Sequence, residues 1–207
     1  KTSSGIKAAS SHTGALGSSD KVVDAVLHQF GIIRADDLND MFNTAKGFED
    51  FRMPKDSKVA VVTNAGGPAI LTVYTLEMNN LALAELSSET KSKLRKIVLP
   101  QGSVNNPVDL LPGGTAEQFK QVNEILVEDQ NVDAVISVFV EPIMVPALPV
   151  IEGINEINSE KPIFQVVMPL PEFWEQYRKE SKTKISVMVD IGRVDEEDLK
   201  EAKDSPV

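Results

Sequence analysis

Short apolar runs alternate with amphipathic stretches along most of the chain, and this pattern predicts a parallel α/β fold. The apolar runs are rich in β-branched residues and lie at 58–64, 81–86, 133–140, 161–168 and 185–191. Such runs are typical of strands that are buried on both faces of a parallel sheet. Helical patterns separate or follow them, at 68–79, 87–97, 115–127, 147–158, 172–181 and 194–203. Ser87 or Ser88 is expected to cap the second of these helices, and Thr115 and Gln118 are expected to form a capping box at the third. The sequence therefore predicts a doubly wound sheet of parallel strands, covered by helices on both faces.

The first 50 residues have a different pattern, with two helices around one short apolar stretch. The first helix begins at Ser19 or Asp20 and ends at Gly31, and the second is expected to be capped by Asp36 and closed by Gly47. A polar, proline-containing connector follows at 51–58. We therefore expect two units. Residues 1–52 form the remainder of a domain truncated at its N-terminus, and residues 53–207 form a second α/β domain.

Composition narrows the classes of function. Hydrophobic residues make up 42% of the 207 residues, which is enough for a packed core, and the absence of cysteine excludes disulfides and thiolate metal sites. The net charge of −10 disfavours binding to nucleic acid or to anionic lipid. No apolar run approaches the ~20 residues of a membrane span, and no signal-peptide pattern is present. We expect a cytoplasmic protein. Because its net charge is negative, we expect it to bind any phosphate through local backbone N–H groups.

His12 is the first candidate for chemistry. It is one of only two histidines and lies in the small-residue segment "ASSHTGALGSSD" at 9–20, just before a helix. Small residues let a ligand approach the imidazole, and a helix N-terminus favours an anion. A neutral ring nitrogen in that setting can take up a phosphoryl group. The alternative is an exposed loop histidine. His28 lies within the helical pattern, and we expect it to be a packed structural residue.

A glycine-containing turn is the second candidate. The stretch "VAVVTNAGGPAI" reads as a strand, a turn and a helix start, with Asn64, Ala65, Gly66 and Gly67 at the turn. Backbone N–H groups at such a turn can bind a phosphate. The alternative is an ordinary tight connection, because the stretch matches neither a Walker A motif nor a dinucleotide fingerprint.

Three further polar residues could support a site. Pro107 restricts Asn106 to an extended conformation, and Asp109 could cap a turn or bind a group. Glu141 follows an apolar run, where a carboxylate could orient an imidazole. For all three the alternative is structural turn chemistry, which the local sequence favours.

Three segments, in order along the chain, resemble the NDP-forming acyl-CoA synthetases, the ADP-forming acetate–CoA ligases related to succinyl-CoA synthetase. "GIKAASSHTGAL" resembles their phosphohistidine segment, and "VAVVTNAGGPAI" and "NNPVDLLPGG" resemble their later landmarks. The first segment matches at Ser11, His12, Thr13 and Gly14, the second from Thr63 to Gly67, and the third at Asn106, Pro107 and Asp109. Gly17 and Ser18 replace the alanine and glycine usual in the family, which keeps the loop small.

The resemblance implies two flavodoxin-like units and a specific reaction. Acyl-CoA, ADP and phosphate would be interconverted with the acid, CoA and ATP, through an acyl phosphate and a phosphohistidine at His12. It also implies that two helix N-termini face the phosphoryl group, with Ser11, Thr13 and Gly14 at one and the turn at 64–67 at the other.

The resemblance further implies partner domains. The complete enzyme needs a CoA-binding Rossmann-like domain and an ATP-grasp domain, in cis or in trans, together with CoA, ADP or ATP and Mg²⁺. This chain shows neither domain's pattern, so we expect an incomplete fragment of an oligomer that binds no cofactor or metal by itself. The alternatives are a regulatory domain, as in fusions with protein acetyltransferases, and a binding domain without chemistry. The intact segment around His12 favours the enzyme.

Overall fold

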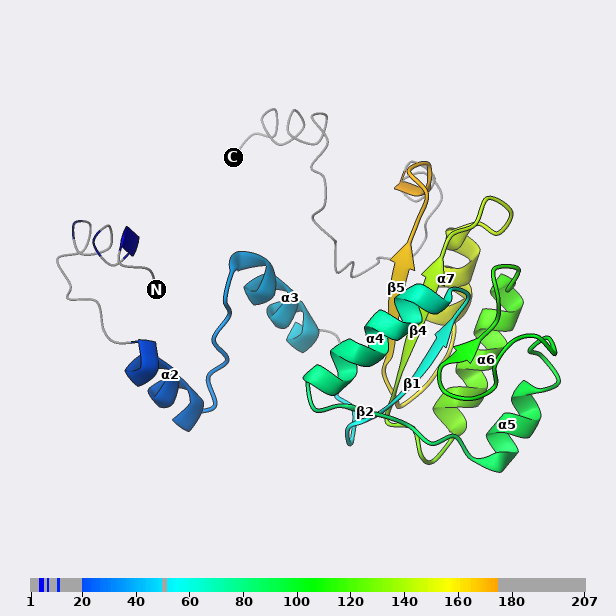
Figure 1. The fold of residues 1–207 in the computed structure, drawn as a ribbon, viewed down its shortest axis with the longest axis horizontal. Helices are drawn as coiled ribbons and strands as arrows, with labels where there is room; N and C mark the ends of the chain where they lie inside the picture. The colour runs from blue at the N-terminus through cyan, green and yellow to red at the C-terminus, as the bar shows by residue number, and fades with distance from the viewer. Residues whose placement is uncertain (1–3, 6, 8–10, 12–19, 50–51, 175–207) are drawn as a thin grey trace. The chain divides into compact units, whose positions relative to one another are not determined.

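The structure is a computed structural model that describes residues 4–5, 7, 11, 20–49 and 52–174, and these described residues divide into two units, one before and one after residue 50 (Figure 1). The expected helix at 172–181, the strand at 185–191 and the final acidic helix lie wholly or largely outside the described residues. Each unit is considered by itself below.

Helix α2 (Asp20–Gln29) of the first unit ends as the sequence predicts. Gly31 has a φ of 65°, the left-handed conformation that favours glycine. Its amide donates to His28 O at 3.1 Å, and the amide of Ile32 donates to Leu27 O at 2.9 Å. This pair of bonds is the Schellman motif, which satisfies carbonyls that the last helical turn leaves open.

Helix α3 (Leu38–Glu49) corrects two expectations about its ends. Its N-terminal cap is Asp37 rather than Asp36, because Asp37 Oδ1 accepts from the amide of Asp40 at 2.9 Å. The carboxylate of Asp40 in turn accepts from the amide of Asp36 at 3.0 Å. Gly47 lies inside the helix and does not end it.

The apolar stripes of these two helices are exposed. Val22 and Val26 on α2, Phe30 just after it and Phe42 on α3 are each 47–72% exposed, and no residue of α2 is buried. The stretch at 32–35 is not a strand. Among the described residues, the predicted parallel sheet is therefore found only in the second unit.

The sheet of the second unit consists of β1 (Lys58–Thr63), β2 (Ala82–Leu83), β3 (Val108–Asp109), β4 (Ala134–Val140) and β5 (Ile163–Met168). The order is β2-β1-β4-β5, with β3 also paired to β1, and every pairing between these strands is parallel. Strand β1 is central and is buried from Val59 to Thr63, as its continuous apolar sequence predicts.

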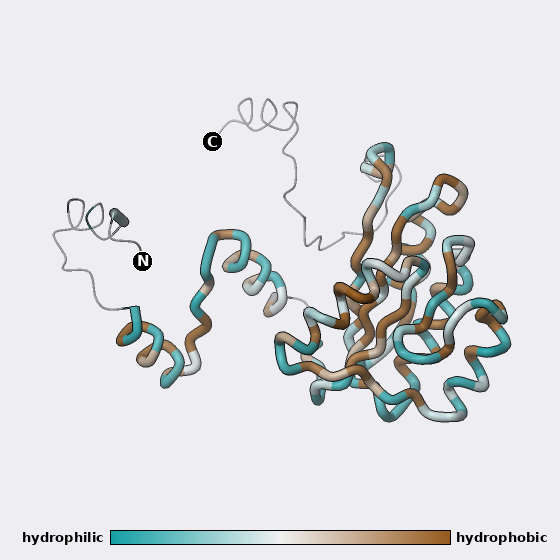
Figure 2. The backbone as a smooth tube through the Cα atoms, viewed as in Figure 1, coloured by the Kyte–Doolittle hydropathy of each residue, from teal (hydrophilic) through white to brown (hydrophobic). Residues whose placement is uncertain are grey.

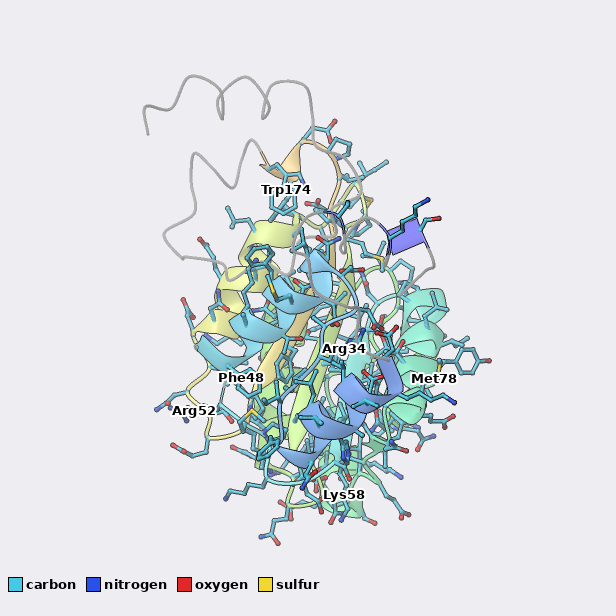
Figure 3. The ribbon with its side chains drawn as sticks, turned by 90° about the vertical axis from the view of Figure 1, so that its left-hand side faces the viewer. Arg34, Phe48, Arg52, Lys58, Met78 and Trp174 are labelled. Atoms are coloured by element: carbon cyan, nitrogen blue, oxygen red, sulfur yellow. The ribbon has the colours of Figure 1, made fainter. Side chains whose placement is uncertain are left out.

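Helices cover both faces of this sheet (Figure 1). The larger core lies under α5 (Ser88–Leu94), α6 (Ala116–Glu128) and α7 (Ala147–Asn155), and a smaller one lies under α4 (Gly66–Met78). Alternate residues of β1 point to opposite faces, so Ala60 and Val62 join the larger core and Val61 joins the smaller. Figure 2 shows the apolar strands inside. The outer side of α4 is apolar too, and Met78 is 84% exposed (Figure 3).

Two helix caps read from the sequence are confirmed. Ser87 Oγ accepts from the amide of Thr90 at 3.1 Å at the start of α5. At the start of α6, Thr115 and Gln118 form a reciprocal capping box, with distances of 3.2 and 3.0 Å.

Asn106 fills a gap in the sheet between β2 and β3. Both strands lie along the same edge of β1, β2 beside its first residues and β3 beside its last. Between them, Asn106 Oδ1 accepts from the amide of Val61 at 2.8 Å, and Nδ2 donates to Val59 O at 2.8 Å and Ala84 O at 3.0 Å. The side chain thus replaces a strand residue, which is the structural alternative, and the predicted support of the site by Asn106 stays a prediction. The sequence missed β3 and gave β2 too many residues.

Replacing Asn106 by alanine is expected to lower the free energy of unfolding by about 2 kcal/mol, because the buried amide of Val61 loses its acceptor. Urea unfolding followed by the fluorescence of Trp174, the single tryptophan, would measure it. Asn105→Ala, at the exposed neighbour, is the matched control and should change stability by less than about 0.5 kcal/mol. Equal stability of the two variants would contradict the bridging role.

Candidate functional site

The candidate residues of the second unit gather at one edge of the sheet. In the register of the strands, Thr63 of β1 is the partner of Asp109 in β3 and of Val138 in β4. The turn into α4 follows Thr63, and Glu141 follows β4. Ligands of open parallel sheets collect at this carboxyl edge, so the predicted turn lies where a binding site would be expected.

The side chain of Asn64 is fully engaged in positioning this turn. It is 2% exposed. Its Nδ2 donates to Val140 O at 2.8 Å, and its Oδ1 accepts from the amide of Val140 at 2.9 Å. This two-bond clamp holds the end of β1 against the end of β4. The side chain of Asn64 therefore holds the turn in place, and a contact between its backbone and a phosphate stays a prediction.

Thr63 fixes the backbone of Ala65, two residues on, a role that the sequence analysis missed. Its Oγ1 accepts from the amide of Ala65 at 2.9 Å and donates to Ala65 O at 3.0 Å. The amide of Ala65 is thus occupied, although the sequence predicted it to bind phosphate. The signal was present, since a threonine two residues before a glycine turn commonly bonds the backbone two residues on.

Gly66 and Gly67 carry the free amides at the start of α4. No side chain caps this helix at Ala65 among the described residues. Pro68 has no N–H, and Ala69 N already reaches Ala65 O at 3.4 Å, so the first turn leaves the amides of the two glycines without intrahelical acceptors. An added Cβ at either glycine would meet nothing within 4 Å. The two glycines therefore leave room for a ligand at the positive end of a helix dipole, where an anion is favoured.

Glu141 is held by backbone on both sides. Its Oε1 accepts from the amide of Ala147 at 2.7 Å, and its Oε2 accepts from the amide of Leu170 at 2.7 Å. The first bond caps α7, because the cap residue Pro146 offers no side-chain acceptor. Both carboxylate oxygens support the fold, which is the alternative that the sequence favoured over orienting an imidazole.

Asp109 also forms turn chemistry. Its Oδ1 accepts from the amide of Leu111 at 2.8 Å, and Leu111 has a φ of 64°. The residue lies beside the glycine turn through its register with Thr63. Its position agrees with the predicted site, and its hydrogen bond to Leu111 is structural.

The phosphohistidine segment is largely outside the described residues. Ser11 is helical and exposed, whereas His12, Thr13 and Gly14 are not described. His28 lies in the last turn of α2 and is exposed rather than packed, a position where the helix dipole favours a cation. In the described part of the chain, no group of acidic residues and histidines could hold a metal ion, and no helix is long and apolar enough to cross a membrane.

Comparison with known proteins identifies the family. A succinyl-CoA ligase-like flavodoxin domain matches residues 1–48, and a Ligase-CoA domain matches residues 59–169, more than half of the chain. The α subunit of an ADP-forming acetate–CoA ligase from Pyrococcus furiosus is 34% identical over 174 residues. The chain belongs to the NDP-forming acyl-CoA synthetases. The matched regions contain all three motifs that carried the resemblance, and the parallel α/β fold of the synthetase chain agrees with it.

The relatives of this synthetase chain differ in the acid that they are named for, and they are longer. A 4-hydroxybutyrate–CoA ligase from Nitrosopumilus maritimus is 37% identical over 133 residues. The alignments cover 81% and 64% of this chain, but only 38% and 19% of the two relatives. A crystal structure of a Pyrococcus horikoshii protein superposes with a TM-score of 0.72 at 31% identity, covering 79% of this chain and 39% of that one.

The glycines of the turn are expected to be dispensable for folding. Gly66→Ala and Gly67→Ala should change the free energy of unfolding by less than about 0.5 kcal/mol, because the new methyl groups meet open space. Gly114→Ala is the contrast, since its Cβ would lie 2.9 Å from Leu110 Cβ, and it should cost about 1–3 kcal/mol. Urea unfolding of the three variants is the measurement. If Gly67→Ala lowers the free energy of unfolding as much as Gly114→Ala does, then a glycine is required at position 67 for packing.

Proposed function

We propose that this chain is the phosphohistidine-bearing part of an ADP-forming acid–CoA ligase. The enzyme interconverts acyl-CoA, ADP and phosphate with a carboxylic acid, CoA and ATP, through an acyl phosphate and a phosphohistidine at His12. The observation that carries the proposal is the pair of free amides at Gly66 and Gly67. They form an anion site in a chain that also carries the "SHTG" segment of the family.

In this reaction a nitrogen of the neutral His12 imidazole attacks the phosphorus of the acyl phosphate. The bond from phosphorus to the acyl oxygen breaks, and the carboxylate leaves with that electron pair. The phosphoryl group later passes from His12 to the terminal oxygen of ADP. Once His12 carries the phosphoryl group, the amides of Gly66 and Gly67 stabilise the negative charge on its oxygens. A chain of net charge −10 has no general positive field for this task, so fixed backbone dipoles perform it.

The remaining components belong to the complete enzyme. A CoA-binding Rossmann-like domain and an ATP-grasp domain, on the same or another polypeptide, supply the sites for CoA and the nucleotide. Mg²⁺ is assigned to the nucleotide domain, because the described residues offer no cluster of metal ligands. We place the enzyme in the cytoplasm, in line with its lack of cysteine.

His12 is expected to carry the phosphoryl group in the complete enzyme. His12→Ala should lower ATP synthesis by several orders of magnitude, because binding alone cannot replace a covalent intermediate. His28→Ala is the matched control and should retain both activity and an acid-labile, base-stable phosphoryl group. Substantial ATP synthesis in the His12 variant would exclude the assignment.

Gly67→Asp is expected to weaken phosphorylation of His12 by at least about 100-fold, because it places a carboxylate beside the amides that receive the phosphoryl oxygens. The variant should still fold, since an added Cβ at this position meets no atom within 4 Å. Rapid-quench measurement of the phosphorylated enzyme, beside Gly67→Ala and a urea unfolding curve for each variant, separates charge from size and from stability. Normal phosphorylation in a folded Gly67→Asp enzyme would overturn the role of this turn.

A further inference from the structure

A polar cluster lies inside the larger core, on the side of the sheet that α6 and α7 cover. Asn123 of α6 is fully buried and Ser137 of β4 is 1% exposed. Asn123 Nδ2 donates to Phe119 O at 2.8 Å and to Ser137 Oγ at 3.2 Å. Asn123 Oδ1 is buried too, and it has no hydrogen-bond partner among the described residues. One strong acceptor of this cluster is thus left over.

A second acceptor without a partner comes from the neighbouring strand. Gln165 of β5 is the register partner of Ser137, so the two side chains lie side by side on one face. Gln165 Nε2 donates to Asn155 Oδ1 of α7 at 2.7 Å. Its Oε1 is buried and, within the described part of the chain, has no donor. Asn123 and Gln165 therefore each adjoin Ser137, and each presents an unsatisfied carbonyl oxygen.

Ser137 supplies the complementary group. In its contact with Asn123 the hydroxyl oxygen accepts, so the hydroxyl hydrogen remains able to donate. The two unsatisfied oxygens of Asn123 and Gln165 thus require two donors, and the hydroxyl of Ser137 supplies only one. Buried oxygens without donors destabilise a core strongly, and native proteins satisfy nearly all of them.

We propose that one internal water molecule is bound at this point between α6, α7, β4 and β5. It donates one hydrogen to Asn123 Oδ1 and the other to Gln165 Oε1, and it accepts from the hydroxyl of Ser137. Three hydrogen bonds are typical of a buried water. Three neutral oxygens are too few for Ca²⁺, which takes ~6–8 oxygen ligands, and an apolar occupant would leave both oxygens unsatisfied.

The water completes a chain of hydrogen bonds through four elements. It runs from Phe119 O through Asn123 and Ser137 to the water, and on through Gln165 to Asn155. This chain requires the observed register of β5 on β4. A slip of one residue would move the side chain of Gln165 to the opposite face of the sheet. The water therefore selects one register and one packing of α6 against α7, and it is independent of the proposed reaction.

A crystal structure of the full chain, at a resolution that shows ordered waters, is the direct test. We expect one water within hydrogen-bond distance of Asn123 Oδ1, Gln165 Oε1 and Ser137 Oγ. A dry site would overturn the proposal. So would a rotated Gln165 amide that donates directly to Asn123.

A solution experiment tests the same point independently. Water ¹⁷O relaxation dispersion counts long-lived internal waters, and the Asn123→Leu, Gln165→Met double variant should show one fewer than the parent. In a double-mutant cycle on the unfolding equilibrium, the shared water should couple the two positions by about tenfold. Gln130→Leu, at an exposed site, should be additive with Gln165→Met. An unchanged water count or an additive cycle at Asn123 and Gln165 would overturn the proposal.

Discussion

Every N–H and C=O group of β1 must be paired, because this strand is buried on both faces and lies between neighbours on both edges. Strand β4 satisfies one edge along its whole length. The other edge has only the two short strands β2 and β3, and the carboxamide of Asn106 completes it. Beyond the last residue of β1, the carboxamide of Asn64 continues the pairing onto Val140. Two asparagine side chains thus act as backbone at the two places where strands are missing.

This use of side chains determines which hydrogen-bonding groups remain available to a ligand at the carboxyl ends of the strands. The polar side-chain atoms of Thr63, Asn64 and Glu141 all bond to backbone groups of the same unit, as does Oδ1 of Asp109. The groups that remain at the turn are the backbone amides of Gly66 and Gly67, in the first turn of the 13-residue helix α4. A rigid frame that presents only N–H groups suits a ligand whose whole surface is anionic oxygen, because a backbone donor needs no reorganisation. In the proposed site, selectivity for charge and geometry would come from these backbone amides, because the predicted set contains no lysine or arginine.

Much of the fold followed from local signals in the sequence. The runs of β1, β4 and β5 and the caps at Ser87 and Thr115 depend on neighbours within a few residues, and all were predicted correctly. The two-residue strand β3 was missed because Pro107 and Asn106 just before it read as a loop. The cap of α3 was misplaced by one residue because Asp36 and Asp37 are equally good caps by type. Asn64, Asn106 and Glu141 each have at least one partner that is 29–76 residues away in the chain, so no local pattern could separate support from ligand contact.

The broken edge formed by β2, Asn106 and β3 has a consequence for the behaviour of the protein at high concentration. Outside β3 the chain folds back, and Ser103 exchanges backbone hydrogen bonds with Asp109 at 3.1 and 2.9 Å. Gly102 makes this approach feasible, since a Cβ there would lie 2.4 Å from Asp109 O. This side of the sheet therefore offers no continuous ladder of free groups onto which a strand of another molecule could add. Interrupting an edge in this way protects a sheet against edge-to-edge aggregation, so a redesign that joined β2 and β3 into one regular strand would gain pairing and lose that protection.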